Sequence, residues 1–171
     1  CHGTNLPIKL INLPVARAET ADNLDRDQAR LELGISMDTL MLATFGRLAR
    51  NKRLEVILRV FSRLREEFSN AHLFLVGKLD PVSSDFNIPE LLQDLGLADF
   101  VEVTGYVERS RFVAYMAAAD IALNLRYPHA GETSGTLVRL LSAGVPTITS
   151  NVGAFAEFPY DCCWKVDVDL T

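Results

Sequence analysis

The stretch Asp120-Ile-Ala-Leu-Asn-Leu-Arg-Tyr-Pro-His-Ala-Gly-Glu-Thr-Ser-Gly135 joins an apolar run to a turn that is rich in glycine and hydroxyl groups. A segment with helical spacing of Leu137, Leu140 and Leu141 comes next, and a second apolar run follows at 147–149. The order is therefore strand, turn, helix and strand. Because the N–H groups and the dipole at a helix start favour negative charge, this turn predicts a phosphate-bearing ligand.

The same alternation of strands and helices runs through the rest of the chain. Continuous apolar runs predict further strands at 8–13, 39–45, 71–76, 100–104 and 164–166. Helical spacing predicts helices at 25–33, 88–95 and 109–119, and a long one whose single apolar face holds Ile57, Val60, Phe61, Leu64 and Phe68. Continuous apolar strands are typical of sheets covered on both faces. We therefore predict an α/β domain with a Rossmann-like, doubly wound parallel sheet.

Length and composition fit one globular domain. A chain of 171 residues can bury one core and is too short for two domains of ordinary size. The formal net charge of −5 argues against nucleic acid as a partner of the whole surface. The three cysteines form neither a disulfide framework nor a metal-ligand pattern. Trp164 and the cysteines beside it are expected in the core.

The ends of the sequence lead to a further expectation. The chain begins at Cys1 and stops at Thr171 without a tail, so we interpret it as one domain of a longer protein, with residues 1–15 as interdomain linker and first strand. No apolar run reaches the about 18 residues that span a bilayer. We expect a cytoplasmic location, with any membrane contact peripheral, at the inner face, and made by another domain.

A basic loop is predicted at the same edge of the sheet as the opening turn. Ligands of such sheets bind beyond the carboxyl ends of the strands, where the loops 46–53, 77–87, 105–107 and 126–135 are expected to meet. Residues 46–53 hold four cations at a strand-to-helix junction. Because cations at a helix start oppose its dipole, the loop indicates either a bound anion or a solvated charge cluster.

Six short motifs, in order, resemble the carboxyl-terminal domain of retaining, GT-B-fold glycosyltransferases of the family 4 type. They are Gly46-Arg47 with Lys52 five residues after the arginine, Leu75-Val-Gly77, Val103-Thr-Gly-Tyr-Val107, Met116-Ala-Ala-Ala-Asp120, Ala143-Gly-Val-Pro146 and Asn151-Val-Gly-Ala-Phe-Ala-Glu157. The resemblance implies one half of a GT-B fold, a domain that binds a nucleotide-diphosphate sugar.

The resemblance also implies roles for individual residues. Arg47 and Lys52, in the loop that Gly46 opens, would hold the diphosphate and offset the charge that builds on it as the glycosidic bond breaks. Backbone N–H groups near Thr133, Ser134 and Gly135 would hold the phosphates from the other side. No metal or cofactor is then required, because two cations and a helix dipole do that work.

The remaining implied contacts involve the base and the sugar. The main chain at Tyr106 and Val107 would meet the base. Glu132 would either hydrogen-bond to sugar hydroxyls or serve only as an acid at the helix start, where it favours the dipole. Arg126 either reaches the phosphates or pairs with Glu132. The family's second glutamate is missing, since Arg139 stands in its place. The form Gly-Glu-Thr-Ser-Gly resembles a bacterial subset of these enzymes.

These expectations describe the donor-binding domain of a hexosyltransferase-type enzyme that transfers a sugar to a saccharide or lipid-linked acceptor. The acceptor site would come from an absent amino-terminal domain, so this chain alone is expected to bind nucleotide weakly and to transfer nothing. Two alternatives remain open. One is a sugar-nucleotide epimerase domain, and the other is a non-catalytic interaction domain whose basic loop docks a protein.

Overall fold

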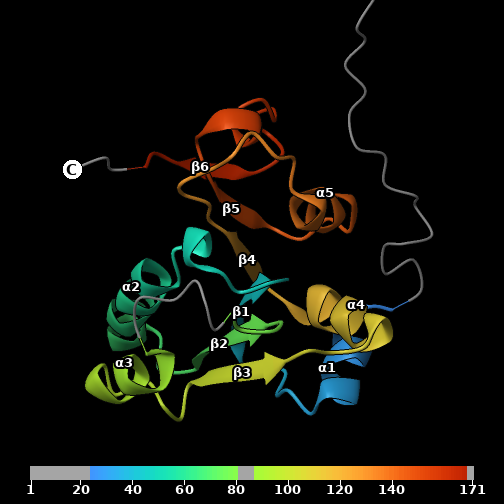
Figure 1. Cartoon of the computed structure of the whole chain (residues 1–171). Helices are drawn as coiled ribbons and strands as arrows, with labels where there is room; N and C mark the ends of the chain where they lie inside the picture. The colour runs from blue at the N-terminus through green and yellow to red at the C-terminus, as the bar shows by residue number, and fades with distance from the viewer. Residues whose placement is uncertain (1–23, 81–86, 169–171) are drawn as a thin grey trace, which may run out of the picture.

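The structure, a computed structural model, describes residues 24–80 and 87–168 as a six-stranded parallel sheet with helices on both faces (Figure 1). The strand order is β3-β2-β1-β4-β5-β6. The strands are β1 (Leu40–Phe45), β2 (Ala71–Val76), β3 (Val101–Gly105), β4 (Ile121–Asn124), β5 (Thr147–Ser150) and β6 (Trp164–Val166). The predicted doubly wound fold is confirmed. The strand predicted at 8–13, and residues 81–86 of the second loop, lie outside the described residues.

The helices divide between the two faces as right-handed crossovers require. They are α1 (Arg26–Leu33), α2 (Leu54–Glu67), α3 (Ile88–Asp94), α4 (Arg109–Ala118) and α5 (Gly135–Ser142), with 3-10 turns η2 (Arg50–Lys52) and η3 (Gly153–Phe155). Figure 1 shows α2 and α3 on one side of the sheet and α1, α4 and α5 on the other. The chain reverses its direction across the sheet between β3 and β4, so the helices change face there. The switch point lies between β1 and β4, where such folds bind ligands. Within the described residues, no helix has both the length and the apolar character needed to cross a membrane.

Helix α1 begins and ends where the sequence predicts. The Asp25 side chain accepts a hydrogen bond of 2.8 Å from the backbone N–H of Gln28, which caps the first turn. Gly34 ends the helix in the left-handed conformation, with φ of 71°. Local sequence signals are therefore sufficient to set this element.

The apolar face predicted for α2 is wrong in part. Ile57 and Phe61 are buried, but Val60 is 61% exposed and Phe68 is 44% exposed. Because α2 covers β1 and β2, the buried stripe also takes in Leu54 and Leu58. Val60 instead lines an apolar groove with residues of β4 and β5.

The expectation that Trp164 and the cysteines beside it lie in the core is also wrong in part. Trp164 is 74% exposed and Cys162 is exposed, while Cys163 is buried. The reason is that β6 lies at one end of the described sheet, with a neighbouring strand on one side only. An apolar residue in such a strand is buried only where a helix or loop also covers it.

A buried arginine ties α1 to the amino-terminal edge of the sheet. The Arg30 side chain is fully buried and donates to the carbonyls of Ser36, Met37, Thr39 and Ala118, at 2.9 to 3.1 Å. Its Nη2 also donates to Oδ2 of Asp120 at 2.6 Å, and the backbone N–H of Met41 donates to the same oxygen. The charge is therefore paired with a carboxylate and hydrogen-bonded through all three nitrogens, as a buried ion needs.

The loops that follow β1 and β2 are in direct backbone contact. The N–H of Gly46 donates to the carbonyl of Val76 at 2.9 Å. A β-carbon placed on Gly77 would lie 1.9 Å from the carbonyl oxygen of Gly46, and Gly77 has a φ of 145°. Only glycine fits this position. A parallel bridge between Leu48 and Leu79 continues the contact beyond the strands.

We predict that Gly77→Ala lowers the free energy of unfolding by about 3 kcal/mol, because a backbone clash adds to backbone strain. Gly96→Ala is the matched control, since Gly96 also has positive φ but an added β-carbon meets nothing within 4 Å. The control should lose only about 1 kcal/mol. Urea unfolding measures both, and equal losses would contradict the proposed clash.

Candidate functional site

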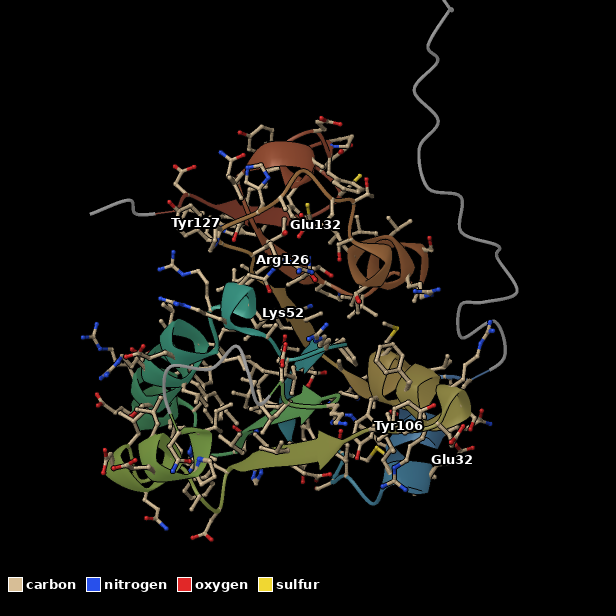
Figure 2. All side chains as sticks on the ribbon, in the orientation of Figure 1. Glu32, Lys52, Tyr106, Arg126, Tyr127 and Glu132 are labelled. Carbon is tan, nitrogen blue, oxygen red and sulfur yellow. The ribbon has the colours of Figure 1, made fainter. Side chains whose placement is uncertain are left out.

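The predicted site residues gather at the carboxyl edge of the sheet. The loops after β1, β2, β3 and β4 meet there, as expected for parallel strands. Figure 2 labels Lys52, Arg126 and Glu132 in the upper part of this region and Tyr106 in the lower part. Two sub-regions result: a buried cationic centre beside the start of α5, and an open pocket beside the second and third loops.

Lys52 is the most deeply buried side chain of the cationic centre, which it forms with Arg126. The short turn η2 bends the chain back over the end of β1, so that Lys52 is only 2% exposed. Its Nζ donates to the backbone carbonyl of Phe45 at 2.8 Å. Burial, with a smaller effect from the charge of Arg126, lowers the pKa of Lys52 to about 7. A bound anion would favour the protonated form.

Arg126 and Glu132 form an ion pair beside this lysine. Nη1 of Arg126 lies 3.5 Å from Oε1 of Glu132, and the Arg126 side chain is 15% exposed. The backbone N–H of Arg126 donates to Oγ of Ser150 at 2.9 Å, which fixes the strand end. The Glu132 carboxylate also accepts from the backbone N–H of Ala130 at 2.7 Å. Backbone hydrogen bonds from its own N–H and from Ala130 lower the pKa of Glu132. Two partners were predicted for Arg126, phosphate or Glu132, and the structure shows the ion pair with Glu132.

The start of α5 forms the opposite wall. Ser134 is the N-cap residue, and its Oγ accepts a hydrogen bond of 3.1 Å from the backbone N–H of Leu137. The N–H groups of Gly135 and Thr136 belong to the first turn and have no acceptor within the helix. A β-carbon on Gly46 would lie 3.3 Å from Oγ1 of Thr136, so the loop after β1 passes close to this helix start. Thr133, one residue before the cap, is exposed.

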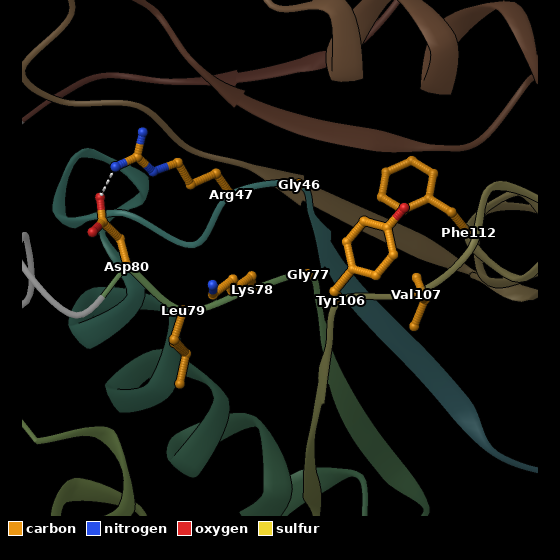
Figure 3. A pocket seen from close by; sticks show the side chains of 9 residues that line it. All are labelled: Gly46, Arg47, Gly77, Lys78, Leu79, Asp80, Tyr106, Val107 and Phe112. Carbon is orange, nitrogen blue, oxygen red and sulfur yellow. Dashed lines mark hydrogen bonds and ion pairs between the residues drawn. The ribbon is translucent and has the colours of Figure 1, made fainter.

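The open pocket has a volume of about 500 Å³ (Figure 3). Its lining residues are Gly46, Arg47, Gly77, Lys78, Leu79, Asp80, Tyr106, Val107 and Phe112. The Arg47 guanidinium lies 2.6 Å from Oδ2 of Asp80, which is 7% exposed. Tyr106 is 74% exposed, and its side chain and Phe112 stand on the other side of the pocket from Arg47. The volume suits a nucleoside-sized ligand.

The structure gives different partners to two residues that were expected to act together. Arg47 extends into the open pocket toward Asp80, whereas Lys52 turns inward to the carbonyl of Phe45. Sequence spacing could not reveal the partner Asp80, because a contact across 33 residues depends on the meeting of two loops. The roles predicted for these residues remain predictions.

Two further features bear on the chemistry available at this edge. Nδ1 of His129 accepts from the backbone N–H of Gly131 at 3.2 Å, and the His129 ring packs so closely on Gly153 that an added β-carbon would lie 2.4 Å from it. His129 thus holds two loops together. In the part of the chain that the structure describes, no three His, Cys, Asp or Glu side chains are grouped as metal ligands.

We predict that the stability of the chain rises with pH above neutrality because of Lys52. Its folded-state pKa, about 7, lies below the unfolded value of about 10.4, so the unfolded chain binds more protons between these values. The free energy of unfolding should gain up to about 1.4 kcal/mol per pH unit in this window. Urea unfolding at pH values from about 7 to 9 measures the effect.

Lys52→Met should remove this rise, and Lys78→Met should keep it, because Lys78 is an exposed lysine of the neighbouring loop. If Lys52→Met retains the wild-type pH profile, Lys52 is not the group responsible.

Comparisons with known proteins agree with this fold. Residues 39–162 match the family model described as glycosyl transferases group 1. The chain is 29% identical over 139 residues to D-inositol 3-phosphate glycosyltransferase 2 of Catenulispora acidiphila. The match covers 77% of this chain and 32% of that protein. The chain thus spans about a third of the length of the curated relatives it matches.

Solved structures show the same fold. Sucrose-phosphate synthase from Thermosynechococcus elongatus is similar with a TM-score of 0.78 and 24% identity, over 93% of this chain and 39% of that one. The Anabaena protein HepE, in complex with UDP, is similar with a TM-score of 0.74 and 17% identity, over 87% of this chain and 40% of that one. Because the family model matches well over half of the residues, the chain belongs to the group 1 glycosyl transferases.

Proposed function

We propose that this chain is the donor-binding domain of a retaining glycosyltransferase, and that the whole enzyme moves a sugar from a nucleotide-diphosphate donor to a saccharide or lipid-linked acceptor. The observation that carries the proposal is the burial of Lys52, 2% exposed, at the sheet edge where α5 begins. A buried ammonium whose one partner among the described residues is a carbonyl is costly unless an anion joins it. A diphosphate matches that requirement.

In this proposal the chain's own charges stabilise the leaving group. As the glycosidic bond breaks, negative charge would grow on the diphosphate, and Lys52 and the first turn of α5 would offset it. Such groups act strongly because they are buried and need no reorganisation during the reaction. Glu132, held by Arg126 and by Ala130, would hydrogen-bond to sugar hydroxyls.

The open pocket is the proposed site of the nucleoside. Its volume of about 500 Å³ suits a base and ribose, with main-chain groups of Tyr106 and Val107 at one side. Arg47, from the opposite side, would contact the diphosphate while keeping or exchanging its partner Asp80. UDP in the structurally similar HepE supports a nucleotide of this class.

The acceptor is proposed to bind elsewhere in the longer enzyme. The chain spans about a third of its relatives' length, and cleft closure between two domains would complete the site. The chain alone is therefore expected to bind donor nucleotide without transferring sugar. Sugar transfer by these 171 residues alone would contradict the proposal that the acceptor binds in another domain.

We predict saturable binding of at least one nucleoside diphosphate among UDP, GDP and ADP, measured by isothermal titration calorimetry. Lys52→Met should weaken that binding at least about tenfold, which corresponds to about 1.4 kcal/mol, because it removes the buried charge. Binding should persist in the presence of a metal chelator, since the proposed contacts are cationic side chains and backbone N–H groups.

Arg50→Ala is the matched control, because it removes a cation from the same loop at an exposed position. Its affinity should stay within about twofold of the wild type. Absence of binding by all three nucleotides, or an equal loss in both variants, would favour the protein-docking alternative. A product assay on the full-length enzyme separates sugar transfer from epimerisation.

We also predict that nucleotide binding takes up a proton above neutral pH. Unbound Lys52 has a pKa of about 7, and a diphosphate beside it would raise that value. At about pH 8 to 9, calorimetry in two buffers of different ionisation enthalpy should report uptake approaching one proton, and affinity should fall as pH rises. Lys52→Met should lose this uptake; a wild-type value in that variant would contradict the assignment.

A further inference from the structure

Asn124, the last residue of β4, is buried without a hydrogen-bond partner for its side chain. It is 1% exposed, and within the described residues neither the oxygen nor the nitrogen of its carboxamide is hydrogen-bonded. Most buried polar groups in proteins have a partner, and an unsatisfied one costs stability. A carboxamide in an otherwise apolar strand therefore needs an explanation.

The position of Asn124 directs it toward the site. Ala43 of β1 pairs with Ala122 of β4, so two residues further on Asn124 lies level with Phe45. Alternation along the strand places Asn124 on the same face as Ala122, which packs in one cluster with Leu140 of α5. Since α5 returns antiparallel to the strands, its first turn lies over the Asn124 end of β4.

Several hydrogen-bond donors lie near the carboxyl ends of β1 and β4, where Asn124 is placed by the strand register. Phe45, level with Asn124 on the neighbouring strand, carries the carbonyl to which Lys52 Nζ donates. Arg126, two residues further along the chain, has a buried Nε that is also without a partner within the described residues. The backbone carbonyl of Asn124 already accepts from Oγ1 of Thr149 at 3.1 Å. An ammonium, a guanidinium, a helix start and a carboxamide N–H together select an anion.

We propose that Asn124 is a further donor-binding residue, whose Nδ2 donates to a phosphate oxygen of the bound nucleoside diphosphate, directly or through one water molecule. This inference rests on the proposed function and assigns it a contact that lies outside the six motifs named above. The competing explanation is that Asn124 is an unsatisfied amide that only destabilises the fold.

The two explanations differ in the link between stability and binding. Asn124→Leu replaces the carboxamide by an apolar group of similar shape, so the melting temperature should stay equal or rise. The same variant should bind nucleoside diphosphate at least about tenfold more weakly than the wild type, if the amide contacts the ligand. Calorimetric titration with UDP, GDP and ADP, and thermal unfolding of the 171-residue chain, measure the two effects.

Thr44→Val is the matched control. Thr44 is fully buried in β1 and its hydroxyl also lacks a partner within the described residues, but it neighbours Ala43 and Phe45 and so faces the opposite side of the sheet. Removing its hydroxyl should affect the melting temperature in the same direction as Asn124→Leu. Its nucleotide affinity should remain within about twofold of the wild type.

Each outcome decides the matter. Wild-type affinity in Asn124→Leu, or an equal loss in Thr44→Val, overturns the inference and leaves the proposed function intact. If Asn124→Leu does not fold, Asn124→Ser is judged by the same criterion, because it keeps a small polar group that is too short to reach the ligand. Absence of nucleotide binding by the wild type overturns both proposals.

Discussion

The close backbone contact between Gly46 and Gly77 is the constraint on which the site depends. Because a β-carbon at position 77 would lie 1.9 Å from the carbonyl oxygen of Gly46, the first two loops can run together only with glycine there. Their pairing continues to Leu48 and Leu79, past the ends of the strands. This brings Arg47 to Asp80 in the open pocket, and the chain then turns back so that Lys52 returns beneath the loop. A rigid scaffold of this kind is what precise binding geometry requires.

The local signals of the sequence were sufficient for the fold and for the edge of the sheet that holds the candidate site. Asp25 and Gly34 delimit α1 through contacts within a few residues, and continuous apolar runs mark the buried strands. Val60 and Trp164 were misplaced because their burial depends on which element covers each part of the sheet. That information is not local to either residue.

The same distinction explains what was missed at the site. Lys52 was expected to hold a diphosphate, and spacing alone did not reveal that a 3-10 turn buries this lysine. The sequence pattern treated Asn124 as an ordinary residue of an apolar strand. Only the strand register places it level with Phe45 and beside α5. A polar residue that interrupts a continuous apolar run at the carboxyl end of a strand is the signal that could have identified it.

The two edges of the sheet bury similar groups in opposite ways. At the amino edge, Arg30 is fully buried and its guanidinium meets four carbonyls and the Asp120 carboxylate. At the carboxyl edge, Lys52 has a single carbonyl partner, and the side chain of Asn124 has none within the described residues. Burial removes polar groups from water at both edges. Only at the amino edge do hydrogen bonds and an ion pair within the described part of the protein offset this desolvation penalty. Buried hydrogen-bond donors that lack protein acceptors and gather at one edge are typical of a binding site, where a ligand supplies the acceptor. Such donors lower the stability of the fold and are retained because function needs them. This contrast is the physical reason for proposing that an anion binds at the carboxyl edge, and it does not depend on any family motif.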